Sequence, residues 1–120
     1  MEIDMSTPSM PANTDHIRDL NDELRRNISH HAGHAVITPG VAALGPDAVL
    51  RIVKTIEVFD DFCQANDPHD EHDFGAFAAD GQTIFFKIDY YDRTLTMHSP
   101  NPADPTVTIR VITIMLAKEY

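Results

Sequence analysis

The sequence predicts an α+β fold in which an antiparallel three-stranded meander packs against two or three helices. Two observations carry this prediction. Asp80-Gly81 lies between two runs rich in β-branched and aromatic residues, which is typical of a two-residue hairpin turn. Elsewhere, apolar residues recur at spacings of three and four, which indicates amphipathic helices. Helices that cover the apolar face of a sheet form a two-layer domain.

A chain of 120 residues is expected to form one domain. Residues 1–13 contain Pro8 and Pro11 and show no periodicity, so we expect a disordered N-terminal arm followed by a single α+β domain over 14–120. No signal peptide and no apolar run long enough for a membrane span are recognisable. Cys63 is the one cysteine, which excludes an internal disulfide and favours a cytoplasmic location.

The first helix is predicted over residues 15–29, with Thr14 as its N-cap. Its apolar stripe comprises Ile17, Leu20, Leu24 and Ile28. Acids lie near its start and arginines near its end, as the helix dipole favours. Gly33 is a natural position for the chain to leave the helix.

Three histidines, His30, His31 and His34, follow this helix and invite a metal-binding interpretation. We favour the alternative, a helix C-terminus at which imidazoles meet free carbonyl groups, because no carboxylate or cysteine stands beside them in the sequence. A short extra strand is expected over residues 35–38, ended by a proline–glycine pair.

The second helix is predicted to open at Gly45-Pro46-Asp47, with proline at the first helical position, and to end near Phe62. Its apolar stripe comprises Val49, Ile52, Val53, Ile56, Phe59 and Phe62. Cys63 follows the helix. We interpret it as a small buried hydrophobe and not as a nucleophile, because neighbouring acids would raise the pKa of its thiol.

The hairpin turn defines a register for the meander. It pairs Ala79 with Gln82, Phe77 with Ile84, and Gly75 with Phe86. A second tight turn at Asp92-Arg93 would pair Tyr91 with Thr94, Asp89 with Thr96, and Lys87 with His98. The two turns place one apolar set on a single face: Phe77, Ile84, Phe86, Ile88, Tyr90, Leu95 and Met97. We expect this face to pack on Ile52, Ile56 and Phe59.

The same register brings polar residues together on the opposite face. His72 lies across from Asp89, and His98 is diagonal to Asp89. Two imidazoles and a carboxylate can ligate a divalent metal ion, so one hypothesis is a metal-dependent enzyme that uses these three residues. The alternative, which we favour, is a hydrogen bond between His72 and Asp89 at the start of the strand. No other cofactor is expected, because P-loop, dinucleotide and GxSxG patterns are not found in the sequence.

The last segment, residues 105–118, has two interpretations. Asp104 followed by Pro105 is typical of a helix start, and this cap chemistry leads us to expect a helix. The run TVTIRVITI is β-branched and alternating, so a strand is the alternative.

The acidity of the chain is concentrated in residues 57–92. This region holds ten acids and one base, a local charge of −9 within a net charge of −10. Such a charge favours a basic protein surface as the partner and disfavours direct contact with nucleic acid or an anionic membrane. The residues predicted to form the partner-binding patch are Asp60, Asp61, Asp67, Asp70, Glu71, Asp73 and Asp92.

The segments DPHDEHDFGAF, IFFKIDYYDRTL and SPNPADPTVTIRVITIMLAKEY resemble the domain-of-unknown-function family 3768 of small bacterial proteins. That family's pattern reads DPxxEHDFGxF, KIDYYD and SPDPADPxVTxRVLTIMLAxEY. The likeness covers residues 17–120, and this chain departs from the pattern at Asn101 and Lys118. The resemblance implies a bacterial cytosolic protein encoded near plasmid or other mobile-element genes, and hence an accessory role such as inhibition of host defence. It implies no activity, cofactor or catalytic residue.

Three classes of function follow. The first, which we favour, is a non-catalytic binding protein that presents its acidic 57–92 region to a basic partner and mimics nucleic-acid phosphates. The second is the metal-dependent enzyme that uses His72, Asp89 and either His98 or Asp70 as ligands. The third is a structural subunit whose acids serve solubility.

Overall fold

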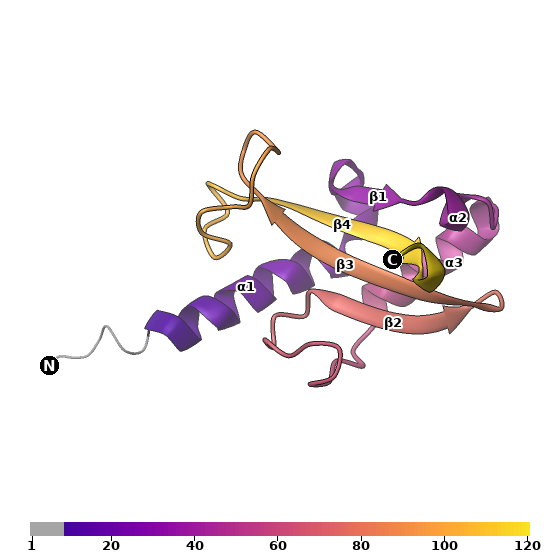
Figure 1. Ribbon diagram of the computed structural model, residues 1–120, viewed down its shortest axis with the longest axis horizontal. Coiled ribbons are helices and arrows are strands. Elements are labelled where there is room, and N and C mark those ends of the chain that lie inside the picture. Colours follow the sequence, from indigo (N-terminus) through magenta and orange to yellow (C-terminus); the bar gives the residue numbers. More distant parts are fainter. Residues whose placement is uncertain (1–8) are drawn as a thin grey trace, which may run out of the picture.

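The computed structural model describes residues 9–120 as an α+β domain, which confirms the predicted class (Figure 1). Its elements in chain order are α1 Ser9–Arg26, β1 Ala35–Ile37, α2 Pro39–Ala42, α3 Pro46–Val58, β2 Phe74–Ala79, β3 Gln82–Tyr91 and β4 Ile109–Leu116. Short 3₁₀ helices lie at Ile28–His30, Ala32–His34 and Ala117–Glu119. Of the predicted N-terminal arm, residues 1–8 lie outside the described part of the chain.

The sheet has four strands in the order β1-β4-β3-β2. β1 runs parallel to β4, whereas the other neighbouring pairs are antiparallel. The predicted three-stranded meander is therefore corrected to a mixed four-stranded sheet. The short extra strand expected over 35–38 is present as β1, at one edge.

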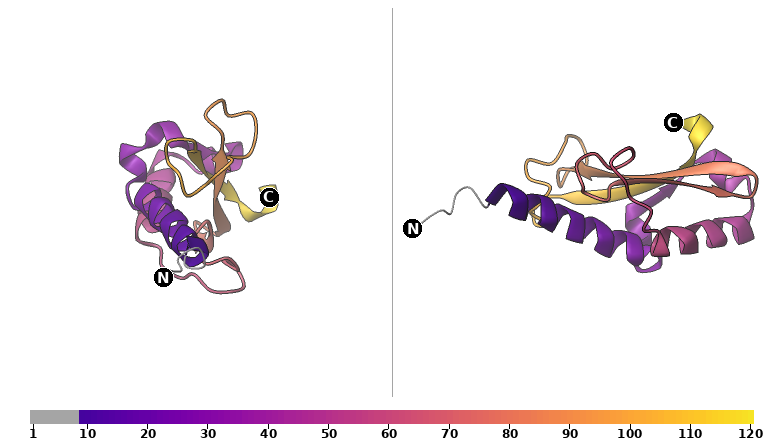
Figure 2. Two further views of the ribbon diagram at one scale, coloured as in Figure 1. Left: turned by 90° about the vertical axis from the view of Figure 1, so that its left-hand side faces the viewer. Right: turned by 90° about the horizontal axis from the view of Figure 1, so that it is seen from below.

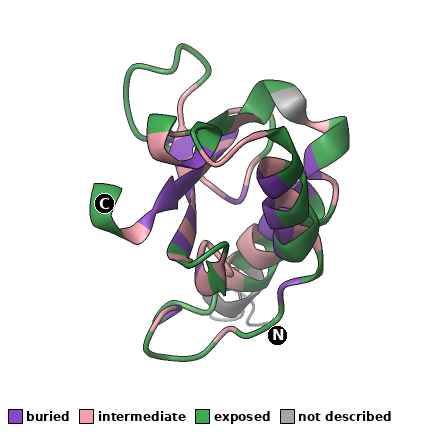
Figure 3. Cartoon of the chain, turned by 90° about the vertical axis from the view of Figure 1, so that its right-hand side faces the viewer, coloured by how far each residue is buried: buried purple, intermediate pink, exposed green. Residues whose placement is uncertain are grey.

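Helices α1 and α3 cover one face of this sheet, as the side view in Figure 2 shows. The core lies between the two layers, where Figure 3 shows buried residues on the facing sides of helix and strand. Its central members are Ile52, Ile56, Phe59, Ile84, Phe86, Ile88, Ile112 and Ile114. Because side chains alternate along a strand, the opposite face of β3 carries Phe85, Lys87, Asp89 and Tyr91.

The hairpin between β2 and β3 has the predicted register. Ala79 pairs with Gln82, Phe77 with Ile84, and Gly75 with Phe86. The turn residues Asp80 and Gly81 both have positive φ, at 52° and 75°, as a two-residue turn of this hand requires. Local turn chemistry was therefore enough to align these two strands.

The second predicted turn is wrong, because β3 pairs along its length with β4 and meets residues 94–98 only at one bridge. Residues 92–98 form a loop in which the Asp92 carboxylate accepts hydrogen bonds from the backbone N–H groups of Thr94 and Thr96. Tyr91 forms an isolated bridge with His98, so the expected pairing of Tyr91 with Thr94 is not made. Leu95 and Met97 consequently lie in solvent, with 54% and 69% of their surfaces exposed.

The helix predicted over 105–118 is also wrong, because most of this segment is the strand β4. Asp104 caps only a local turn, in which its carboxylate accepts hydrogen bonds from Thr106. β4 instead fills the position between β1 and β3, where Ile112 and Ile114 reach the core with at most 1% of their surfaces exposed. A β-branched segment gains more from this burial and from two hydrogen-bonded neighbours than from an isolated helical turn.

Helix α1 is longer than the predicted helix at its start. It begins at Ser9, ahead of the expected N-cap Thr14, and ends at Arg26, before Ser29. Pro11 does not prevent this start, because the N–H groups of the first helical turn have no acceptor within the helix.

Helix α3 ends at Val58, earlier than the predicted end near Phe62. The buried Arg25 of α1 explains this end. Its Nη1 donates to the carbonyl oxygens of Ile56 at 2.9 Å and Phe59 at 2.6 Å, so a cation from another helix satisfies the free C-terminal carbonyls.

Candidate functional site

The acidic residues that follow α3 divide into exposed groups and groups that hold the fold. Asp60, Asp61 and Asp70 are exposed, whereas Glu71 and Asp73 are half-buried. Asp67 is buried, and its carboxylate accepts hydrogen bonds from the N–H groups of Glu71 and His72 at 2.9 and 3.1 Å. The seven predicted partner-binding residues therefore do not form one uniform patch.

Asp92 is separated from the other predicted partner-binding residues. It lies in the loop after β3. In Figure 1 this loop lies above the sheet, whereas the 60–73 segment lies below it. The hydrogen bonds of Asp92, led by that from the Thr94 hydroxyl, lower the pKa of its carboxyl. Asp92 therefore organises its own loop.

His72 lies on the helix-covered side of the sheet, where its Nδ1 is 2.8 Å from Oδ1 of Asp22 on α1. Its ring stacks on Phe62 with centroids 3.9 Å apart and planes at 4°. The predicted contact between His72 and Asp89 is therefore wrong. β2 begins only at Phe74, and His72 has a positive φ of 56°, so the strand's alternation does not extend to it.

Asp89 points to the uncovered face of the sheet, where its Oδ2 accepts a hydrogen bond from Nζ of Lys87 at 3.0 Å. This bond raises the pKa of Lys87. Asp89 and His98 border one shallow recess, together with Asp73, but His72 does not line it. Two of the three predicted metal ligands thus border one recess, and the third lies elsewhere.

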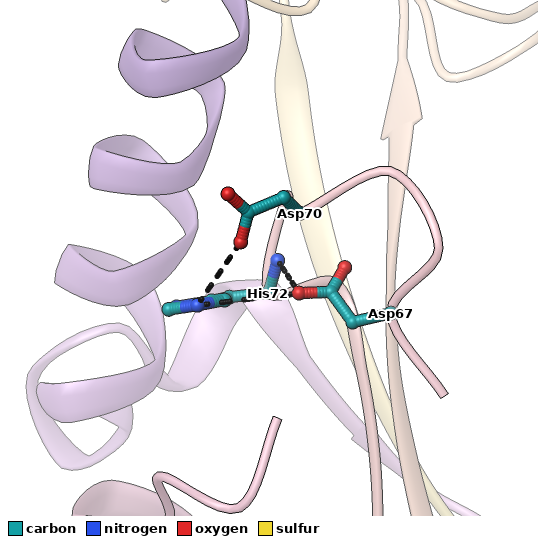
Figure 4. A group of neighbouring side chains, drawn as sticks. All are labelled: Asp67, Asp70 and His72. Carbon is teal, nitrogen blue, oxygen red and sulfur yellow. Dashed lines mark hydrogen bonds and ion pairs between the residues drawn. The ribbon is translucent and has the colours of Figure 1, made fainter. Parts of the chain in front are cut away.

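A different trio surrounds His72. Donor atoms of Asp67, Asp70 and His72 lie within 4.8 Å of one another, and this is the one such group of three or more found within the described residues. Figure 4 shows the two carboxylates directed toward the imidazole. Nε2 of His72 lies 4.0 Å from Oδ2 of Asp67 and 3.9 Å from Oδ1 of Asp70.

The interior next to this trio contains a polar network that sequence reasoning missed. Asn21 donates to the Tyr90 hydroxyl at 2.7 Å, and that hydroxyl donates to Glu71 at 2.8 Å. Arg110 donates from Nε to Asn21 at 2.8 Å and lies over the Tyr90 ring. The network joins α1, the 67–73 segment, β3 and β4. Its one sequence signal is polar Asn21 beside the apolar stripe of α1.

Burial shifts the titration of several of these groups. It would by itself raise the pKa of Asp22, but the hydrogen bonds from His72 and Arg25 outweigh it and hold that pKa below its ordinary value. Burial and the nearby Glu71 raise the pKa of Asp73. Burial also raises the pKa of Tyr90, so the phenol stays protonated and can donate to Glu71.

The buried charges cancel within the core. Asp22 and Asp67 are the buried acids, and Arg25 and Arg110 are the buried bases of the described residues. Two negative and two positive charges sum to zero, so the net charge of −10 is carried by the remaining residues of the chain.

Arg18 of α1 connects acids of the 67–73 segment with acids of the helix. The guanidinium binds Asp15 at 2.7 Å and Asp70 at 2.8 Å. The Asp15 hydrogen bond, with Asp70 and Asp19 nearby, raises the pKa of Arg18. Asp15, Asp19 and Asp70 therefore surround a single base, and their three negative charges exceed its one positive charge.

The histidines after α1 satisfy local groups. His31 Nε2 lies 3.3 Å from Oε2 of Glu23, and His34 Nδ1 lies 3.0 Å from the carbonyl oxygen of Arg110. The interpretation that these imidazoles meet free carbonyl groups at the end of the helix is therefore corrected, because His31 faces a carboxylate and His34 faces a carbonyl group of β4. Within residues 9–120, none of the helices combines the length and the apolar character needed to cross a bilayer.

A mixed four-stranded sheet covered on one face by helices, with a His–Asp-linked acidic segment before β2, thus defines this α+β domain. The model of the family described as "Protein of unknown function (DUF3768)" matches residues 37–119, and the chain belongs to that family. The family resemblance seen in the sequence is confirmed. No curated protein and no solved structure matches the chain.

Proposed function

We propose that this protein is a small, acidic, non-catalytic binding protein whose 57–92 region engages the basic surface of a partner protein. The observation that carries the proposal is the state of Asp60 and Asp61. Both are exposed, and within residues 9–120 their carboxylates form no ion pair or hydrogen bond. Adjacent unpaired carboxylates repel each other, and a basic partner relieves that repulsion.

Not every acid of the 57–92 region is available for a contact with a partner. Asp67 and Glu71 are engaged in the fold, as hydrogen-bond acceptors for the backbone and for Tyr90. Asp60 and Asp61 form the proposed contact centre, and the carboxylates around Arg18 extend it. A partner that ordinarily binds nucleic acid has the complementary surface, and inhibition of such a partner by an accessory protein of mobile elements is the sharpest form of the proposal.

The test is capture of partners from a bacterial lysate by the immobilised full chain, over about 0.05 to 0.5 M salt, across which the screening length falls several-fold. Capture should weaken steadily with salt. The captured protein should itself bind heparin, which presents the anionic charge of a nucleic-acid backbone.

A matched pair of variants makes the test specific. Asp60→Asn with Asp61→Asn should abolish capture. Glu23→Gln with Asp47→Asn changes the net charge equally at exposed sites outside the 57–92 region and should leave capture intact. Equal capture by the two variants, or capture insensitive to salt, would show that the acids serve solubility, as in a structural subunit.

A further inference from the structure

We infer that Asp67, Asp70 and His72 form a binding site for one divalent cation of the zinc class. The inference rests on the three candidate ligand atoms, an imidazole nitrogen and two carboxylate oxygens, and on how their side chains are oriented. It is independent of the proposed partner contact, whose centre is Asp60 and Asp61.

The imidazole presents a free nitrogen to the site. Asp22 is a carboxylate that can only accept, so the proton of the His72–Asp22 hydrogen bond resides on Nδ1 of His72. Nε2 is the ring nitrogen that faces Asp67 and Asp70. Metal-bound histidines in proteins are commonly oriented in this way, with the second ring nitrogen donating to a carboxylate.

The two carboxylates are oriented by groups outside the trio. Arg18 Nη1 donates to Oδ2 of Asp70 at 2.8 Å, which leaves Oδ1 of Asp70 to face His72. Backbone N–H groups hold both oxygens of Asp67. Such supporting hydrogen bonds keep ligands in position before an ion arrives.

The two carboxylate oxygens and Nε2 of His72 face one another, and all three donors lie within 4.8 Å of one another. Donors around a four-coordinate zinc ion lie about 3.4 Å apart, given metal–ligand distances of about 2.1 Å. The separations of 3.9 and 4.0 Å from Nε2 exceed this by about 0.5 Å, and all three donors lie within 4.8 Å of one another.

The surroundings leave room for a further ligand. The trio borders an open recess of about 340 Å³, which Cys63 and Gln64 also line. Cys63, which the sequence led us to expect as a buried hydrophobe, is instead exposed, and its thiol is not one of the donors that lie within 4.8 Å of one another. A nitrogen and two carboxylate oxygens suit zinc better than magnesium or calcium, which take oxygen donors.

The test is titration of the metal-free full chain with Zn²⁺ alone near pH 7.5, in competition with a chromogenic chelator, because zinc binding requires a neutral imidazole. One high-affinity site per chain is expected. Asp70→Asn should weaken zinc binding at least about tenfold, the lower end of the loss seen when the groups around a metal are changed. Asn tolerates the positive φ of 58° at this exposed position, so the variant should fold.

Three further variants separate the possible sources of binding. Asp61→Asn makes the same charge change in the same segment and should leave zinc affinity unchanged. His72→Asn retains an N–H donor for Asp22, removes Nε2, and should lose the site while circular dichroism shows an intact fold. A combined His31→Gln and His34→Gln change removes surface imidazoles and should have no effect.

Several results would overturn the inference. No zinc binding would mean that the three side chains only hold the 67–73 segment in place. Zinc affinity unchanged in Asp70→Asn, or lost in the His31 and His34 variant, would place the ion on the surface histidines. Loss of partner capture in Asp60→Asn with Asp61→Asn, with zinc binding retained, would by contrast support the inference as one independent of the partner contact.

Discussion

Asp22 and His72 are joined by a hydrogen bond of 2.8 Å between Oδ1 and Nδ1 that fixes the acidic segment before β2 to helix α1. The same Asp22 oxygen accepts a hydrogen bond from Arg25 at 3.1 Å, and Arg25 holds the end of α3. One carboxylate therefore links α1, the end of α3 and the segment that leads into the sheet. Its replacement should affect all three.

Asp22→Asn should lower the free energy of unfolding at pH 7 by about 1.5–3 kcal/mol, the range for a hydrogen bond to a charged group. The pKa of Asp22 in the folded state is depressed below its ordinary value of 3.8. Its contribution is therefore complete above the unfolded pKa and is lost as pH falls through the folded pKa. Urea unfolding at a series of pH values should show the variant and the parent converging below about pH 4. A difference that stays constant down to pH 2 would contradict this assignment.

Tyr90→Phe should destabilise the protein by about 1–3 kcal/mol, because Asn21 and Glu71 then lose a buried hydrogen-bond partner. Tyr91→Phe is the matched control. Tyr91 lies on the uncovered face of β3, and its hydroxyl has no hydrogen bond within the described residues. Its replacement should change stability by less than about 0.5 kcal/mol, as measured by denaturant unfolding. Equal effects of the two changes would argue against the buried network.

Gly75→Ala should destabilise the protein by about 1–3 kcal/mol through overpacking. A Cβ atom at this position of β2 would overlap the ring of Phe86 and approach Cε2 of Phe59 to 2.8 Å. Gly33→Ala is the control, since an added Cβ there meets nothing within 4 Å. Thermal unfolding of the two variants should separate them clearly, and a neutral Gly75→Ala would mean that the Phe86 ring is free to move.

Phe86→Ala should cost about 3–5 kcal/mol, because its fully buried ring contacts Phe59 at the centre of the core. Phe85→Ala removes the same atoms from the opposite, uncovered face of β3. There the ring is half-buried against Phe74 and Tyr120, so the loss should be smaller. The comparison by urea unfolding tests which face of the strand is the interior.

The hairpin shows what could be predicted from local sequence. Asp80 and Gly81 adopt the positive φ values that align β2 and β3, and no distant residue is needed to fix that register. The burial of Ile84, Phe86 and Ile88 follows from it by alternation. The same extrapolation failed for His72 because β2 begins only at Phe74, which the pattern of residues does not reveal.

The final strand shows the limit of local reasoning. Asp104 and Pro105 carry helix-start chemistry, yet Ile109–Leu116 is a strand because β1 and β3 provide two hydrogen-bonding edges and a core to fill. The parallel pairing of Ala35–Ile37 with Ile112–Ile114 joins segments far apart in the chain. Pairings between such distant segments cannot be predicted from the secondary-structure propensities of the residues.

The sequence by itself determined the α+β class, the hairpin register, the positions of the two main helices and the concentration of acidic charge, because each depends on residues near one another in the chain. Only the tertiary structure decided which acids are free and what surrounds His72. Asp67 and Glu71 became part of the interior because the backbone N–H groups and the Tyr90 hydroxyl required acceptors there. Asp22, which lies on another helix, became the partner of His72 because packing α1 against the sheet brought the two together.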